Sequence, residues 1–372
     1  MVICIDRFLS DQYLSGYRLL IEDLMEELAR CHPMHRFVWL TAAPQAAGIS
    51  LASNITIYPV NSLVLKWLGK KAWSKTGLPR LLRKLQADLF ISAGNLPVPV
   101  TPVPCLLFLP ALPLYSGTDK SSRQAVRQLI SASRRLQAIA VFSHPSENCI
   151  RENYQAAAAK IVYLKLAAIH PILPLSAEER EKVKDRFAAG LEYFVFAGDL
   201  REEHMLTALL KAFSQFKKWQ RSNMQLVIAG NKTAWTDTWL STIPSYKWRK
   251  DVHILQDLPK EELLAVIAGA YAFVYPARHE PVPVNPLYAL HAGVPVIASR
   301  IPVIEEVVEQ AVLYASVNDE SGFSAAMQAL YKDEQLRDSL IQKGHQHLTA
   351  TAVDMVKDCW HILETGLNRE SV

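Results

Sequence analysis

The chain has 372 residues, of which half are hydrophobic and a fifth are charged, so its composition is that of a globular protein of two or three domains and excludes a disordered one. Its net charge of +4 is too small to predict nucleic-acid binding. Five cysteines without a Cys-x-x-Cys pair exclude a disulfide scaffold and a thiolate zinc site. Glycine is scarce: the chain has 14 glycines among its 372 residues, whereas a glycine content of about 7% is usual.

Short apolar runs alternate with amphipathic helical patterns in the first half of the chain. This alternation is typical of βαβ units around a parallel sheet. The expected strands span 2–6, 37–41, 55–59, 88–92, 105–109 and 138–142, and the expected helices span 17–30 and 121–136.

A basic segment, 66–84, contains two tryptophans and no acidic residue. Tryptophan beside lysine or arginine is suited to the headgroup level of an anionic membrane. The alternative is a solvated helix face with both tryptophans turned into the core. Gly69 and Gly77 favour that alternative, because they interrupt any long amphipathic helix.

Residues 165–190 contain a proline-containing linker and then a helix that Ser176 caps. A second α/β series follows, so we expect two Rossmann-like domains with a deep cleft between them, over 1–168 and 169–345, and a final helix in 346–372. Ligands bind such sheets at the carboxyl ends of their strands. The expected strands span 193–197, 225–229, 252–255, 272–275, 295–298 and 311–314, and the helices 204–219, 260–269, 287–292 and from 320 onward.

No run approaches the ~18 apolar residues of a membrane span. The first apolar segment, Met1–Asp6, reaches a charged residue too early and is too short to be the hydrophobic region of a secretory leader. We therefore expect a cytoplasmic protein, peripheral to the inner membrane face if the basic segment binds lipid.

Several motifs in order along the chain resemble the family 4 (group 1) glycosyltransferases of the GT-B architecture. They are the strand and glycine of Phe194–Gly198, the helix Leu209–Phe213, the strand and glycine of Leu226–Gly230, the run Ala289–Ser299, and Ser15-Gly16 before the first helix. The resemblance implies two Rossmann-like domains with a deep cleft, and a last helix, 346–372, that crosses back to the first domain. It also implies transfer of a sugar from a nucleotide-sugar donor.

The diphosphate-binding positions of this family are altered. The family has an arginine directly after the first strand glycine and a lysine nine residues before the helix phenylalanine. Those positions hold Asp199 and His204 here. Asp199 has the wrong sign for a diphosphate, so Arg201, two residues further on, is the candidate substitute.

The family also has two glutamates eight positions apart around a glycine-rich loop. The resemblance gives Glu280 the first, catalytic position beside the donor sugar, while the second is Tyr288, which could make one hydrogen bond to the nucleotide. Pro281 and Pro283 replace loop glycines and each removes an N–H donor. The alternative role for Glu280 is a partner of the dipole of the helix at 287–292.

The remaining donor-binding candidates are Gly16, Gly198, Arg278 and Glu306. In the first domain, Pro110 stands where the family often has a histidine. The resemblance implies no cofactor beyond the nucleotide-sugar co-substrate and no metal, because basic groups and helix N-termini would neutralise the diphosphate.

Two functions follow from these observations. The first is a retaining glycosyltransferase that acts on a polysaccharide or lipid-linked acceptor. The second is a catalytically degenerate GT-B protein that binds a glycan or a protein, which the joint alteration of Asp199, His204, Pro110 and Tyr288 favours. Another nucleotide-sugar reaction, such as epimerisation or phosphorolysis, is a further alternative.

Overall fold

A computed structural model describes residues 1–6, 15–41, 51–60, 73–93, 101–110, 136–153, 160–350 and 354–368. The chain divides into two compact units. The first contains Met1–Tyr13, Leu20–Ile169 and Asp354–Val372, and the second contains Leu14–Leu19 and His170–Val353. The helix expected over 121–136 lies, up to residue 135, outside the described residues, as does the part of the basic segment before Trp73.

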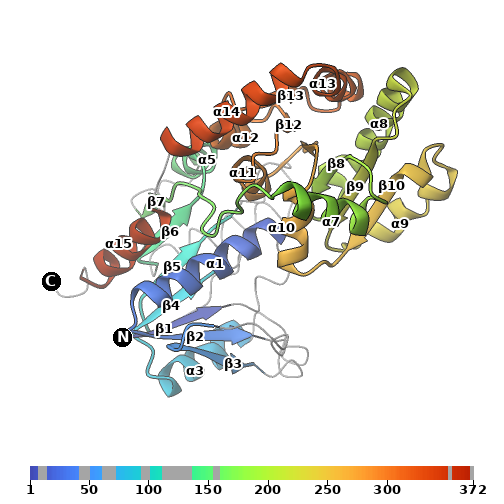
Figure 1. Cartoon of the computed structure of the whole chain (residues 1–372). Helices are drawn as coiled ribbons and strands as arrows, with labels where there is room; N and C mark the ends of the chain where they lie inside the picture. The colour runs from blue at the N-terminus through green and yellow to red at the C-terminus, as the bar shows by residue number, and fades with distance from the viewer. Residues whose placement is uncertain are drawn as a thin grey trace. The chain divides into compact units, whose positions relative to one another are not determined.

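The first unit is built on a parallel seven-stranded sheet in the order β3-β2-β1-β4-β5-β6-β7 (Figure 1). The apolar runs correctly predicted six of these strands, and β7 was missed because it is only three residues long. The strands are β1 (Val2–Asp6), β2 (Arg36–Thr41), β3 (Ile55–Pro59), β4 (Leu89–Ser92), β5 (Cys105–Phe108), β6 (Ala138–Val141) and β7 (Ile161–Tyr163).

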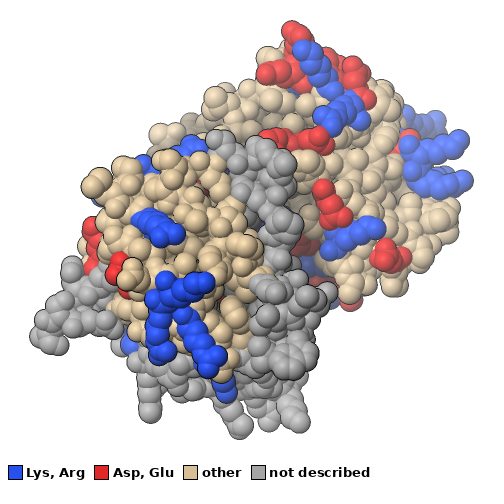
Figure 2. Space-filling model, turned by 90° about the horizontal axis from the view of Figure 1, so that it is seen from below, with Lys and Arg blue, Asp and Glu red and all other residues tan. Residues whose placement is uncertain are grey.

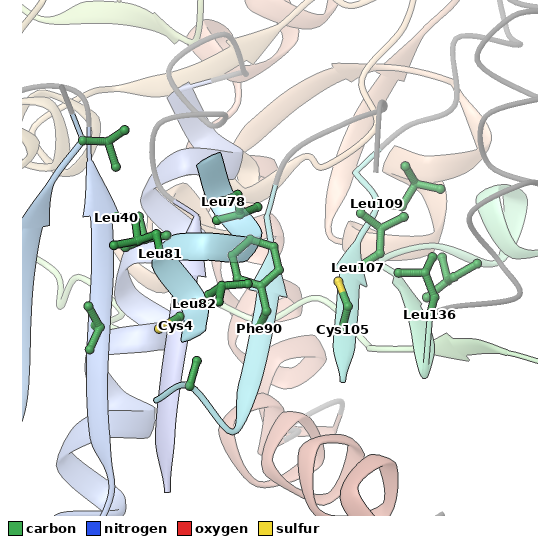
Figure 3. Packing of buried hydrophobic residues seen from close by; sticks show 14 of the residues in the cluster. Cys4, Leu40, Leu78, Leu81, Leu82, Phe90, Cys105, Leu107, Leu109 and Leu136 are labelled. Carbon is green, nitrogen blue, oxygen red and sulfur yellow. The ribbon is translucent and has the colours of Figure 1, made fainter. Parts of the chain in front are cut away.

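Helices pack against this sheet with apolar side chains. The helices are α1 (Ser15–Cys31), α3 (Leu78–Lys84), α5 (His144–Asn153) and α15 (Met355–Asn368), and a π-helical turn, Trp73–Gly77, leads into α3. Leu78 and Leu82 of α3 join Cys4 and Phe90 of the strands in one buried cluster (Figure 3). The last helix, α15, belongs to this unit, because its Trp360 stacks on His32 with a ring-centroid distance of 3.5 Å.

The second unit has a parallel six-stranded sheet in the order β10-β9-β8-β11-β12-β13. This is the doubly wound order, in which the first and fourth strands, here β8 and β11, are neighbours and the chain changes direction between them. Ligands bind such sheets outside the carboxyl ends of these two strands. The strands are β8 (Tyr193–Ala197), β9 (Gln225–Gly230), β10 (Val252–Gln256), β11 (Ala272–Tyr275), β12 (Val296–Ser299) and β13 (Val312–Ala315).

Helices cover both faces of this second sheet. Successive side chains of a strand point to opposite faces, so neighbouring residues of one strand contact different helices. The Tyr193 hydroxyl donates to the Val266 carbonyl of α10 (2.7 Å), whereas the next ring, Phe194, packs edge-on against Phe216 of α8. The helices are α7 (Ala177–Phe187), α8 (Leu206–Gln220), α9 (Thr236–Leu240), α10 (Lys260–Ala268), α11 (Val284–His291), α12 (Pro302–Val308), α13 (Glu320–Lys332) and α14 (Glu334–Ala350), with 3-10 turns at Glu202–His204, Ile243–Ser245 and Arg249–Asp251.

Two helix starts test the local predictions. Ser176 caps α7 through a capping box with Glu179, as the sequence predicted. The helix expected from residue 204 begins at Leu206 instead, because His204 ends a 3-10 turn and Met205 is left-handed, with φ +47°. The break turns His204 away from the helix and back toward the end of β8.

Replacing Gly230 with alanine tests the close approach of the β8 and β9 ends. A Cβ at Gly230 would lie 1.6 Å from the carbonyl oxygen of Gly198, so we expect the substitution to lower the free energy of unfolding by roughly 3 kcal/mol or more. Urea unfolding followed by circular dichroism measures this change.

Gly344→Ala in α14 is the matched control. A Cβ there would first meet the end of the Leu290 side chain, at 3.2 Å, which can move, and alanine favours a helix by up to about 1 kcal/mol. Equal destabilisation by the two variants would contradict the close approach at Gly230.

Candidate active site

The doubly wound topology brings together two loops of the second unit that are far apart in sequence. One follows β8 and carries Arg201 and His204, and the other follows β11 and carries Glu280. His204 and Glu280 are 76 residues apart, yet their side chains form a hydrogen bond of 2.9 Å. Three of the residues singled out in the sequence therefore meet at the end of the sheet where ligands bind.

The Glu280 carboxylate is the centre of this cluster. Its Oε2 accepts hydrogen bonds from His204 Nε2 (2.9 Å), the Tyr275 hydroxyl (2.7 Å) and Arg201 Nη2 (3.3 Å). Its Oε1 accepts from the backbone N–H of Val282 (3.2 Å). These partners, rather than the N–H groups of α11, compensate a carboxylate that is only 3% exposed.

The partners of Glu280 determine its charge. Burial raises the pKa of this carboxyl, but the hydrogen bond from His204 and the positive charge of Arg201 lower it by more, and the resulting pKa is about 2. Glu280 is therefore ionised at neutral pH and has no proton to donate. Burial and the neighbouring carboxylate raise the pKa of Tyr275 well above its usual value, so this tyrosine stays a hydrogen-bond donor.

His204 is held on both sides of its ring. Nδ1 lies 2.6 Å from the carbonyl oxygen of Asp199, and Nε2 faces Glu280. The ring is 1% exposed and packs against Phe196 and Tyr275. Gly198 makes room for it, because a Cβ there would lie 3.1 Å from His204 Cε1 and 2.9 Å from the end of Phe196.

Arg201 is the most accessible member of the cluster, with 18% of its side chain exposed. Within the described chain its Nη2 donates to Glu280 and to the carbonyl oxygen of His279, and it lies 3.3 Å from His204 Nε2. Nε is buried without an acceptor among the described residues. The guanidinium is thus anchored on one nitrogen and keeps donors for another anion.

The other predicted donor-binding residues lie in varied surroundings. Arg278 is exposed and its Nη2 donates to Asn318 Oδ1 (3.4 Å). Tyr288 is fully buried in α11, and Glu306 is half-buried in α12. Gly16, in the first turn of α1, groups with the second unit, and a Cβ there would lie 2.9 Å from Val284. Their roles in donor binding stay predictions.

Sequence reasoning missed two polar residues of this region. Tyr275 is the last residue of β11 and was counted only as part of an apolar strand, although a hydroxyl at a strand's carboxyl end is a signal of a site. Asn285, in the first turn of α11, donates to the carbonyl oxygen of Ala197 (2.9 Å), and its Oδ1 is buried without a donor among the described residues. Both link the β11 side of the site to β8.

Comparisons with known proteins agree with this geometry. Residues 177–347 match the family model of glycosyl transferases group 1. The matched residues make up most of the second unit, which is therefore similar to this family. The chain is 26% identical over 217 residues to the O-antigen chain mannosyltransferase B of Escherichia coli. The matched region covers 58% of this chain and 54% of that protein. The chain thus spans about half the length of that relative.

Solved structures establish the GT-B fold. The sucrose-phosphate synthase of Thermosynechococcus elongatus superposes with a TM-score of 0.77 at 14% identity, covering 98% of both chains. HepE of Anabaena, solved with UDP and glucose, superposes with a TM-score of 0.72 at 15% identity, covering 98% of this chain and 99% of that one. The chain therefore has the fold of two Rossmann-like domains.

The described residues also bear on metal binding and on membrane insertion. No group of three or more histidine, cysteine, aspartate or glutamate side chains is placed there to hold a metal ion. In the same part of the chain, no helix combines the length and the apolar character that crossing a membrane requires.

The low pKa of Glu280 predicts how Glu280→Gln changes stability with pH. A carboxyl whose folded pKa lies below its unfolded value stabilises the fold above the unfolded pKa and loses this effect as pH falls toward the folded pKa. We expect Glu280→Gln to lower the unfolding temperature most at pH 7, and less as pH falls below about 4.5. Thermal unfolding from pH 7 to pH 3.5 measures the difference.

Glu202→Gln is the control for this pH series, because Glu202 is exposed in the adjoining turn. Its unfolding temperature should follow that of the parent chain throughout. A Glu280→Gln deficit that stayed constant across the pH range would mean that the carboxyl is not held ionised by its neighbours.

Proposed function

We propose that this chain is a group 1 glycosyltransferase that transfers a sugar from a nucleotide-sugar donor, with retention of configuration, to a polysaccharide or lipid-linked acceptor. The observation that carries the proposal is Arg201, a cation anchored at the ends of β8 and β11 with donors left for an anion. As the sugar leaves, negative charge develops on the diphosphate, and a preorganised cation stabilises it.

The role of Glu280 follows from its charge and its contacts. The family resemblance places Glu280 at the catalytic position beside the donor sugar, and we propose that it lies there. An ionised carboxylate that accepts four hydrogen bonds is unsuited to donating a proton and suited to fixed electrostatic support. We therefore propose an electrostatic role for Glu280.

The named relatives support the substrate classes. HepE was solved with UDP and glucose, which supports a nucleotide-sugar donor. The relative from Escherichia coli is named an O-antigen chain mannosyltransferase, which supports a polysaccharide or lipid-linked acceptor and mannose among the sugars to test. No cofactor other than the co-substrate enters this proposal.

A non-catalytic, glycan- or protein-binding role is the second candidate. Tyr288, which replaces the second glutamate of the family, is fully buried. Pro281 and Pro283 offer no N–H to a ligand, and Val282 between them gives its N–H to Glu280. These departures favour a site that no longer binds a nucleotide.

Nucleotide-sugar binding distinguishes the two candidates. We expect one member of a panel of UDP-, GDP- and ADP-sugars, with mannose and glucose among the sugars, to raise the unfolding temperature at millimolar concentration, because a ligand that binds only the folded state stabilises it. Arg201→Ala should abolish the shift, whereas Arg300→Ala, on a surface pair with Glu305, should keep it. Failure of every donor to bind would favour the non-catalytic role.

We also propose a peripheral contact of the first unit with anionic lipid, at the inner membrane face of a cytoplasmic protein. In the described part of the segment 66–84, Lys75, Arg80, Arg83 and Lys84 are exposed. Figure 2 looks from below onto the face that carries α3, where basic side chains gather. Trp73 packs against the hydrophobic core, so the described cations, rather than this ring, would carry the attraction.

Charge reversal on α3 tests the lipid contact. We expect Arg80→Glu with Arg83→Glu to reduce sedimentation with phosphatidylglycerol vesicles by about tenfold or more, because each basic residue near such a surface contributes about 1 kcal/mol. Lys211→Glu with Lys218→Glu, on α8 of the second unit, changes the net charge equally and should have little effect. Equal losses would indicate attraction by net charge alone.

A further inference from the structure

We infer that His204 is a positioning residue which, through Glu280, fixes the guanidinium of Arg201 for a nucleoside diphosphate. This inference rests on the proposed function and assigns His204 a task other than direct donor binding. With 1% of its side chain exposed, His204 offers no surface to a ligand. Its effect must pass through the groups that it touches.

The two ring nitrogens of His204 both face hydrogen-bond acceptors. The carbonyl oxygen of Asp199 lies 2.6 Å from Nδ1, and the ionised carboxylate of Glu280 lies 2.9 Å from Nε2. Neither acceptor has a hydrogen to give, so each ring nitrogen is placed to donate a hydrogen bond. A planar ring with two fixed donors defines the position of the carboxylate more closely than a flexible lysine ammonium would.

Glu280 lies between Arg201 and His204 and contacts both. Arg201 Nη2 lies 3.3 Å from His204 Nε2, and each lies within 3.3 Å of the same Glu280 oxygen, Oε2. The three side chains therefore form one unit, in which His204 orients the carboxylate that in turn orients Arg201.

The backbone of the β8 loop holds His204 in this place. Met205, directly after it, adopts φ +47°, a left-handed conformation that is unfavourable for a residue with a Cβ. The backbone N–H of Arg278 donates to the carbonyl oxygen of Glu203 at 2.8 Å, which ties the turn to the loop after β11. The loop thus accepts strain and fastens both sides of the site around the histidine.

The consequence for a ligand concerns the second phosphate. Arg201 keeps an 18% exposed side chain and a buried Nε without an acceptor among the described residues. A diphosphate gives such a guanidinium more negative charge than a monophosphate does. The ratio of the affinities for a nucleoside diphosphate and its monophosphate therefore reports how well Arg201 is positioned, independently of how the nucleoside binds.

Calorimetry with UDP and UMP, repeated with the guanosine and adenosine pairs, measures this ratio. We expect Arg201→Ala to weaken diphosphate binding about tenfold or more and to leave monophosphate binding nearly unchanged. His204→Gln should weaken diphosphate binding by a similar factor in the parent chain. In the Arg201→Ala background it should have little further effect, because its action passes through Arg201.

Two variants guard against a general loss of structure. His253→Gln is the matched control, because His253 is a half-buried histidine on β10 that bonds to Gln225 and not to the cluster. Circular dichroism establishes that each variant folds. Glu280→Gln, which keeps the size of the side chain and breaks the same chain of contacts, replaces His204→Gln if that variant does not fold.

The outcomes separate the inference from the proposed function. If the parent chain binds none of the nucleotides at millimolar concentration, the proposed function fails and the inference fails with it. If it binds a diphosphate but His204→Gln leaves the affinity ratio unchanged, only the inference is overturned. An equal effect of His204→Gln with and without Arg201 would also overturn it, because His204 would then act without Arg201.

Discussion

The buried carboxylate of Glu280 connects the two loops on which the candidate site depends. Moving such a charge out of water is costly unless hydrogen bonds and opposite charges compensate it. His204 and Arg201 from the β8 loop, and Tyr275 and the N–H of Val282 from the β11 side, provide this compensation. Each partner is fixed in turn by the carboxylate, so the site is an ionic cluster before any ligand arrives.

Sheet topology explains why this cluster forms where it does. In the order β10-β9-β8-β11-β12-β13, the strands β8 and β11 are neighbours although they are far apart in sequence. Their parallel pairing, Ala272 with Phe194 and Phe273 with Val195, places the loops that follow them at one edge of the sheet. Gly198 and Gly230 permit the close approach of β8 and β9 at this edge. The few glycines that the chain keeps thus include those that shape the site.

Much of the fold could be predicted from the sequence, because apolar runs bury completely in a parallel sheet and stand out between polar segments. The strand β7 was not predicted, because three residues are too few to form a recognisable apolar run. The site could be predicted only in part. Arg201, His204 and Glu280 were singled out, but their pairing depends on strand order and on the left-handed turn at Met205, and neither is visible in local residue patterns. Tyr275 was not predicted as a site residue, because a tyrosine at the end of a strand is equally typical of the hydrophobic core.

The altered family positions gain a physical interpretation from this cluster. A lysine would present a mobile charge to the diphosphate, whereas His204 is buried and holds the carboxylate that anchors Arg201. The most direct test of this account is the release of nucleoside diphosphate from nucleotide-sugars, measured for the parent chain and for Arg201→Ala. The account predicts release from at least one donor and a loss of about a hundredfold in the variant. Release that Arg201→Ala leaves unchanged, or no release from any donor, would contradict it.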